Sequence, residues 1–161
     1  MRKRAEVSIL AVFLSLAIVC LFYPLFEYIR VTENVKAMQK SIEAALENQT
    51  VIASVEQYDY IKSNGQSQYV ENEDSKNTEI VQKMLTGMGY TQNGEEWTNA
   101  DNTKYRILNA RLEDINDQPG HIRYKIIYDI KATYTVFGIS IKDITYSRRT
   151  LAEMYPVPTN N

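Results

Sequence analysis

Side chains that could do chemistry are few in this chain, and they lie far apart. The one histidine, His121, follows Gly120 in a turn-rich stretch, and the one cysteine, Cys20, lies inside an apolar run. A zinc site or a Cys–His pair needs such groups gathered together, so neither is expected. Glu95 and Glu96 are adjacent, and on a strand adjacent side chains point to opposite faces, away from shared acid–base work.

Three short charged clusters could bind ions, but each is more typical of a structural role. The acidic residues of 71–74 lack EF-hand spacing and are typical of a solvated loop, and those of 114–117 are typical of turn capping. Arg148 and Arg149 could hold an anion, but a solvated or paired strand end is the favoured interpretation. No G-x-S-x-G, P-loop or G-x-G-x-x-G motif occurs. The sequence therefore predicts no enzyme, cofactor, metal site or small-molecule substrate.

The charge distribution points to a membrane rather than to nucleic acid. Arg2, Lys3 and Arg4 open a chain whose net charge is −2, so the remainder is mildly acidic and a basic groove for phosphates is not expected. Residues 7–26 then form a run of 20 residues without a charge. As a helix this run spans about 30 Å, the thickness of a hydrocarbon core. The basic end is expected in the cytoplasm, with Arg30 onward outside.

An uncleaved anchor is favoured over two alternatives. A cleaved signal peptide needs small residues in an A-x-A-like pattern, whereas the chain reads "YPLFEYIR" after Phe22. A lipoprotein would use Cys20, but Val19 stands before it where a small residue is expected. Pro24 removes one backbone donor late in the segment.

The helix is expected to continue beyond the membrane as a stalk. Neither Pro nor Gly interrupts 25–64, and apolar residues recur at alternating spacings of four and three. This stripe comprises Val31, Val35, Met38, Ile42, Ala45 and Ile52, with Gln49 as its one polar member. The favoured interpretation is packing on the protein's own sheet; the alternative is a seam with copies of the same helix.

A short helix and a sheet are expected in the remainder. Asn77 or Thr78 can cap a helix that ends at Gly87 and Gly89, and Asn93-Gly94 predicts a tight hairpin. A strand is expected over 105–112, with Leu108, Ala110 and Leu112 on one side. Apolar or aromatic residues then fill every even position of 122–136, which is typical of a long strand with one wet face. Gly138 ends it, and a parity change at Lys142-Asp143 predicts a bulge.

These elements define an α+β fold in which a long N-terminal helix, half transmembrane and half stalk, packs on a small antiparallel sheet. The expected organisation is a basic stub (1–6), a transmembrane helix (7–28), a stalk helix (29–62), an extracytoplasmic α+β domain (63–155) and a disordered tail (156–161).

The chain resembles the TadE-like group of pilin-like proteins. The resemblance is carried by "RKRAEVSILAVFLSLAIVCLF" with its early Glu6, by the helix "VKAMQKSIEAALE", and by the ending "TYTVFGISIKDITYSRRTLAEMY" with Ala152-Glu153-Met154-Tyr155. It implies a pilin-like fold and a non-catalytic component of a pilus or secretion apparatus in the cytoplasmic membrane. In pilins the helix glutamate is placed at the fifth position after cleavage, whereas Glu6 here directly follows Ala5.

If the resemblance holds, Glu6 would neutralise a neighbouring subunit's terminal amine. The simpler role is local, because a carboxylate in the first turn favours the helix dipole and can pair with Arg2 or Lys3. The expected partners are the lipid bilayer and other pilin-like subunits or membrane assembly proteins. The alternative function is a single-pass anchored extracytoplasmic binding or sensory module that acts on a neighbouring membrane protein, for which the distinguishing feature is a pocket with convergent polar groups.

Overall fold

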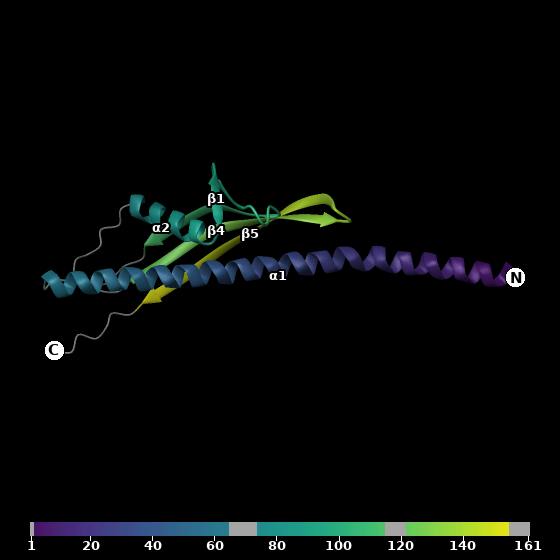
Figure 1. The fold of residues 1–161 in the computed structure, drawn as a ribbon, viewed down its shortest axis with the longest axis horizontal. Helices are drawn as coiled ribbons and strands as arrows, with labels where there is room; N and C mark the ends of the chain where they lie inside the picture. The colour runs from purple at the N-terminus through teal and green to yellow at the C-terminus, as the bar shows by residue number, and fades with distance from the viewer. Residues whose placement is uncertain (1, 65–73, 115–121, 155–161) are drawn as a thin grey trace.

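The computed structural model shows a long helix with a sheet and a short helix along one side of its C-terminal half (Figure 1). The described backbone covers residues 2–64, 74–114 and 122–154, and the side chains of 2–8, 56–64, 74–76, 114, 122 and 154 lie outside the description. The expected α+β architecture, with a long N-terminal helix on an antiparallel sheet, is confirmed. The predicted tail and the acidic clusters at 71–73 and 115–117 lie outside the described residues.

Helix α1 runs from Arg2 to Asn64 as one element of 63 residues, with Pro24 inside it. It therefore passes without a break through the expected boundaries at 6–7 and 28–29. A proline inside a helix removes one N–H and leaves the carbonyl four residues earlier without its usual donor. The first half of α1 extends beyond the sheet, whereas the second half lies beside it (Figure 1).

The sheet is a five-stranded antiparallel meander whose strands follow the chain in the order β1-β2-β3-β4-β5. The strands are β1 (Tyr90–Asn93), β2 (Glu96–Asn99), β3 (Tyr105–Asp114), β4 (Ile122–Val136) and β5 (Ile139–Met154). Each neighbouring pair is antiparallel. The predicted hairpin is present between β1 and β2, where Asn93 pairs with Glu96 and Gly94 takes a φ of 65°. Glycine adopts this left-handed conformation at little steric cost.

Strand β4 confirms the alternation that its sequence predicts. Tyr124, Ile126, Tyr128, Ile130 and Ala132 are buried, while the intervening described residues are partly exposed. Side chains in a strand alternate between faces, so the even positions face α1 and form the core with it. That core also includes Val31, Val35, Ile42 and Leu46 from α1, Val81, Met84 and Leu85 from α2, and Trp97, Tyr105 and Ile107 from the sheet.

Strand β3 departs from the predicted alternation. The prediction placed Leu108 with Ala110 and Leu112, but Tyr105 and Ile107 are buried before Asn109 and Leu112 after it. The pairing with β4 shifts between Leu108 and Arg111, and Asn109 has a φ of 53°. A bulge inserts one extra residue and reverses which face the following residues occupy, which accounts for the error.

Two further boundaries differ slightly from prediction. Helix α2 spans Asp74–Gly87, so it begins before the caps proposed at Asn77 or Thr78, although Gly87 does end it. Strand β5 carries its irregularity opposite Tyr134 and Thr135, which pair with Lys142 and Ser140. The extra residue is thus Ile141, one position before the parity change that predicted a bulge.

Candidate functional site: the junction of helix and sheet

The first half of α1 presents apolar side chains on all sides. Between Ile9 and Ile29 all the large hydrophobic residues except the half-buried Tyr23 are 48–76% exposed: Ile9, Leu10, Val12, Phe13, Leu14, Leu16, Ile18, Val19, Leu21, Phe22, Leu25, Phe26, Tyr28 and Ile29. In the described part of the chain, α1 is the one helix long and apolar enough to cross a membrane, over Ile9–Val55. None of the most apolar stretch of this helix is buried. A helix that is hydrophobic all round needs an apolar surrounding.

The second half of α1 is amphipathic, and the sheet covers its apolar stripe. Val31, Val35 and Ile42 are fully buried against the core, and Met38 and Ala45 are partly buried. Ile52 remains 43% exposed, and the buried face passes instead through Leu46 and Thr50. The stripe therefore packs on the protein's own sheet as far as Ala45. Glu6 lies on α1, but its side chain is outside the description, so its assembly role stays a prediction.

The departure at Ile52 follows from helix geometry. A seven-residue repeat has 3.5 residues per turn, whereas a straight α-helix has about 3.6, so the repeat drifts by about 20° per heptad. Three heptads separate Val31 from Ile52, and the drift carries Ile52 to the side of the buried face. A supercoil would correct the drift, but α1 packs on a sheet.

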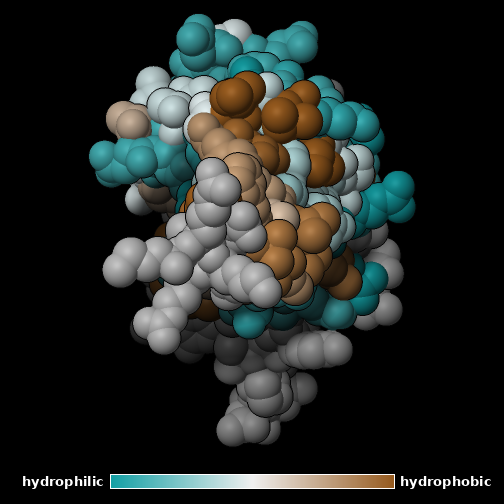
Figure 2. All heavy atoms as spheres, turned by 90° about the vertical axis from the view of Figure 1, so that its right-hand side faces the viewer, coloured by the Kyte–Doolittle hydropathy of each residue, from teal (hydrophilic) through white to brown (hydrophobic). Residues whose placement is uncertain are grey.

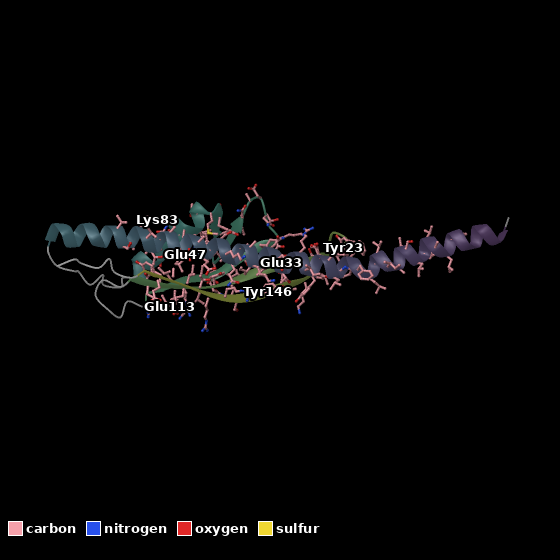
Figure 3. All side chains as sticks on the ribbon, turned by 90° about the horizontal axis from the view of Figure 1, so that it is seen from below. Tyr23, Glu33, Glu47, Lys83, Glu113 and Tyr146 are labelled. Atoms are coloured by element: carbon pink, nitrogen blue, oxygen red, sulfur yellow. The ribbon has the colours of Figure 1, made fainter. Side chains whose placement is uncertain are left out.

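At the junction of the two halves, the end of the β4–β5 hairpin contacts α1. The Tyr23 and Phe137 rings stack with centroids 4.4 Å apart and an interplanar angle of 12°. Tyr134 Oη donates a hydrogen bond of 2.6 Å to the Pro24 carbonyl oxygen. Figure 3 shows Tyr23 on α1 beside this end of the sheet. Residues about 110 positions apart in sequence thus meet at the last turn of the apolar run.

A buried carboxylate lies one turn farther along α1. Glu27 is 5% exposed. Its Oε1 accepts hydrogen bonds from Lys104 Nζ at 2.9 Å and from Thr135 Oγ1 at 3.1 Å, and Arg30 lies 3.5 Å from Oε2. Lys104 Nζ also donates to Thr135 Oγ1 at 2.8 Å. The backbone carbonyl of Lys104 accepts a hydrogen bond from Thr133 N. A charge out of water must be paired and hydrogen-bonded, and this one is.

Sequence reasoning missed Glu27, although one signal pointed to it. Glu27, Val31 and Val35 follow one another at spacings of four, so they share a face of the helix. The uncharged run ends at Phe26, and Glu27 is the first charge after it. No local motif gives this carboxylate a role. Its partner Lys104 is 77 residues away, and nothing local in the sequence indicates that pairing.

The remaining surface offers little for chemistry. Among the described residues no group of three or more His, Cys, Asp or Glu side chains could hold a metal ion. A groove of about 430 Å³ between α1 and the β1–β2 region is lined by Asn34, Ala37, Met38, Ser41, Met88, Tyr90, Asn99 and Asn102. A second, of about 490 Å³, lies between α2 and the sheet. In that second groove, Arg111 and Glu113 pair with each other at 3.6 Å, and Lys125 also binds Glu113.

On the sheet face turned away from α1, charged side chains pair across strands. Asp143 accepts a hydrogen bond from Thr133 at 2.8 Å and lies within 3.4 Å of Lys131 and Arg106. These contacts, the Thr133 bond above all, lower the pKa of Asp143. Arg123 pairs with Glu153 at 2.7 Å. Arg148 lies on the opposite face, the one that packs on α1, because it pairs with the buried Tyr128; it lies over the Tyr146 ring and donates to the Ser147 carbonyl. Because β5 spans Ile139–Met154, Arg148 and Arg149 lie within the strand, and their predicted place at a strand end is wrong.

Comparisons with protein-family models, with curated proteins and with solved structures find no match for this chain. The site is therefore defined by geometry alone. It is the junction at which an apolar, uncovered helix becomes an amphipathic, sheet-covered one, held by the Tyr23–Phe137 stack, the Tyr134–Pro24 hydrogen bond and the Glu27–Lys104–Thr135 cluster.

Proposed function

We propose that this chain is a membrane-anchored, pilin-like component of a pilus or secretion apparatus, non-catalytic and acting by assembly through its N-terminal helix. One observation carries the proposal: a single helix of 63 residues is apolar and uncovered over most of residues 9–29, and its own sheet covers one face of it over residues 31–50. A pilin-like subunit needs this division, with one helical half for lipid or neighbouring helices and a small domain attached to the other.

The proposed topology places the basic residues at the N-terminus in the cytoplasm and the sheet outside. Cations flanking an apolar span favour the cytoplasmic side, and Arg2, Lys3 and Arg4 precede this one. A Glu95→Cys variant in a Cys20→Ser background tests the topology, because Glu95 lies at the exposed β1–β2 turn. A membrane-impermeant maleimide should label it in intact cells. Labelling only after lysis would contradict the topology.

Assembly is tested with cysteine crosslinking in membranes. Cys20 is exposed on the uncovered half and serves as the first probe. In a Cys20→Ser background, a single cysteine moved in turn from Val12 to Leu21 should give oxidative dimers that peak every three or four positions. That period identifies one helical face as the contact. Monomer throughout, or equal crosslinking at every position, would contradict helix-mediated assembly.

The alternative is an anchored extracytoplasmic binding or sensory module acting on a neighbouring membrane protein. Its support is the groove beside Asn34, Asn99 and Asn102, where three amides and the Ser41 hydroxyl line an open hollow. Such a module needs no copy of itself, so it predicts monomeric spans in the crosslinking series. Replacing Asn99 and Asn102 with Ala should abolish its function and leave a pilin-like assembly intact.

A further inference from the structure

The β4–β5 hairpin ends in an exposed apolar tip, in contrast to the β1–β2 hairpin. Phe137, Ile139 and Ile141 are 54%, 66% and 59% exposed, and they fall within five residues. The β1–β2 turn instead carries Asn93, Gly94, Glu95 and Glu96. Figure 2 looks along α1 from its N-terminal end and shows hydrophobic residues gathered on the helix and at the end of the sheet above it.

The tip also retains backbone strain. Val136 pairs with Ile139 across a two-residue turn, in which Phe137 has a φ of 51° and Gly138 a φ of 78°. Two-residue turns with positive φ at both positions favour Asn-Gly, and a non-glycine residue there costs about 1–2 kcal/mol. A soluble turn would take Asn at position 137. Phenylalanine gives up that preference and places its ring against Tyr23.

The contact with Tyr23 fixes the level of the tip along the helix. Tyr23 lies three residues before the end of the apolar run at Phe26, which is about 4.5 Å at 1.5 Å per residue. The Phe137 ring is therefore level with the last turn of the span, where aromatic residues favour the membrane–water interface. The exposed cations Arg30 and Lys142 lie next to this level, after Glu27 on α1 and after Ile141 on β5.

We infer that the β4–β5 tip is a second membrane contact, in which Phe137, Ile139 and Ile141 enter the interfacial layer of the bilayer that holds the span. This inference rests on the membrane anchoring proposed above. The occupant is lipid because the tip is continuous in space with the apolar face of α1 that none of the described residues buries. The contact would hold the sheet at a fixed height and orientation on the membrane, with Glu27, Lys104 and Thr135 closing the polar side of the junction.

Depth-dependent fluorescence quenching tests the inference on the full chain in liposomes. An environment-sensitive NBD label is attached at Cys20 in the unaltered chain, at Ile139→Cys in a Cys20→Ser background, or at Glu95→Cys in the same background. Lipids with a nitroxide at a shallow acyl position provide the quencher. The label at 139 should lose fluorescence to an extent comparable with that at Cys20, whereas the label at 95 should remain unquenched.

The three labels separate the possible failures. If Cys20 is unquenched, the anchoring itself is wrong; if Cys20 is quenched and 139 is not, only the tip inference is overturned. If a neighbouring subunit's span covers the tip, the label at 139 will resist lipid quenching at low lipid-to-protein ratios and lose its blue-shifted emission on dilution, which also overturns it.

A second variant guards against misfolding. Phe137→Asn creates the preferred Asn-Gly turn, so it relieves strain while it removes the ring. It should reduce quenching at position 139 and leave the cross-strand register intact. Unchanged quenching at position 139 in Phe137→Asn would mean that the aromatic ring does not hold the tip at the bilayer, contrary to the inference.

Discussion

The two halves of α1 differ in whether the chain itself covers their apolar surface. In the second half a stripe of apolar residues meets the sheet, so that Val31, Val35 and Ile42 are removed from solvent by the chain itself. In the first half, residues such as Leu16 and Leu21 are 61% and 76% exposed, and none of the most apolar stretch is buried by the described part of the chain. One continuous helix thus contains a stabilised part and a part that depends on its surroundings.

The difference teaches that hydrophobicity alone does not locate the core. The more apolar half contributes nothing described to the core, whereas the more polar half supplies four of its fully buried side chains. Periodicity decides the matter, because only a one-sided stripe can pack on a flat sheet and leave the other side wet. The junction at Tyr23 to Glu27 is where one regime passes into the other.

The largest expected effect comes from making one substitution in both halves. Leu46→Ala removes a fully buried side chain and should lower the free energy of unfolding of the sheet domain by about 2.7–5 kcal/mol. Leu16→Ala, in the uncovered half, should change it by less than about 0.5 kcal/mol. Denaturant unfolding in detergent, followed by the fluorescence of buried Trp97, measures both. Equal effects would break the comparison.

An introduced charge should have the opposite pattern: a large effect in the first half of α1 and a small one in the second. Leu16→Arg places a cation near the centre of the apolar run, where the cost of membrane insertion is about 2.5–3.5 kcal/mol. Ala44→Arg, on the exposed side of the covered half, should leave insertion unchanged. The measurement is the share of protein that remains in the membrane pellet after alkaline extraction. Retention of Leu16→Arg at the wild-type level would mean that the first half does not span lipid.

The junction itself should respond at an intermediate level. Glu27→Gln removes the charge that Lys104 and Thr135 hold, and the free energy of unfolding should fall by about 1.5 kcal/mol, the lower end for hydrogen bonds to charged groups because Lys104 keeps contact with water. Glu33→Gln is the matched control, since Glu33 pairs with Lys36 on the exposed side of α1. Its effect should stay below about 0.5 kcal/mol. If the two variants unfold alike, the buried cluster has no special role.

Much of the architecture could be predicted from local pattern. The apolar helix, the stripe after it as far as Ala45 and the even-position alternation of β4 each follow from local sequence pattern, and each is present as expected. The bulge at Asn109 was missed because one asparagine in a left-handed conformation leaves no periodic trace in the sequence. The exposure of Ile52 was missed because a heptad was applied to a straight helix.

The junction was hardest to predict because its contacts are long-range. Tyr23 with Phe137, Pro24 with Tyr134 and Glu27 with Lys104 join α1 to the sheet across 77 to 114 positions. The first two contacts depend on where the β4–β5 hairpin turns, and the third depends on the pairing of Lys104 with Thr133 of β4. Glu6, by contrast, stands out in sequence because its neighbours are cations and apolar residues. Glu27 stands out only in three dimensions.

The smallest expected effect concerns the stability that Asp143 contributes on the solvent-exposed face of the sheet, the face turned away from α1. A carboxyl whose folded-state pKa is lowered contributes stability above its unfolded value, and loses it as pH falls through the folded value. The pKa of Asp143 is below its ordinary 3.8, chiefly through the Thr133 hydrogen bond and also through Lys131 and Arg106. The difference in free energy of unfolding between the wild type and Asp143→Asn should therefore be constant near neutral pH and shrink below about pH 4.

Unfolding curves between pH 6 and pH 3 measure this advantage of the wild type, with Asp101→Asn in an exposed turn as the control. An advantage that persists undiminished at pH 3 would show that the contribution of Asp143 to stability does not depend on its charge, and that its hydrogen bonds alone account for that contribution.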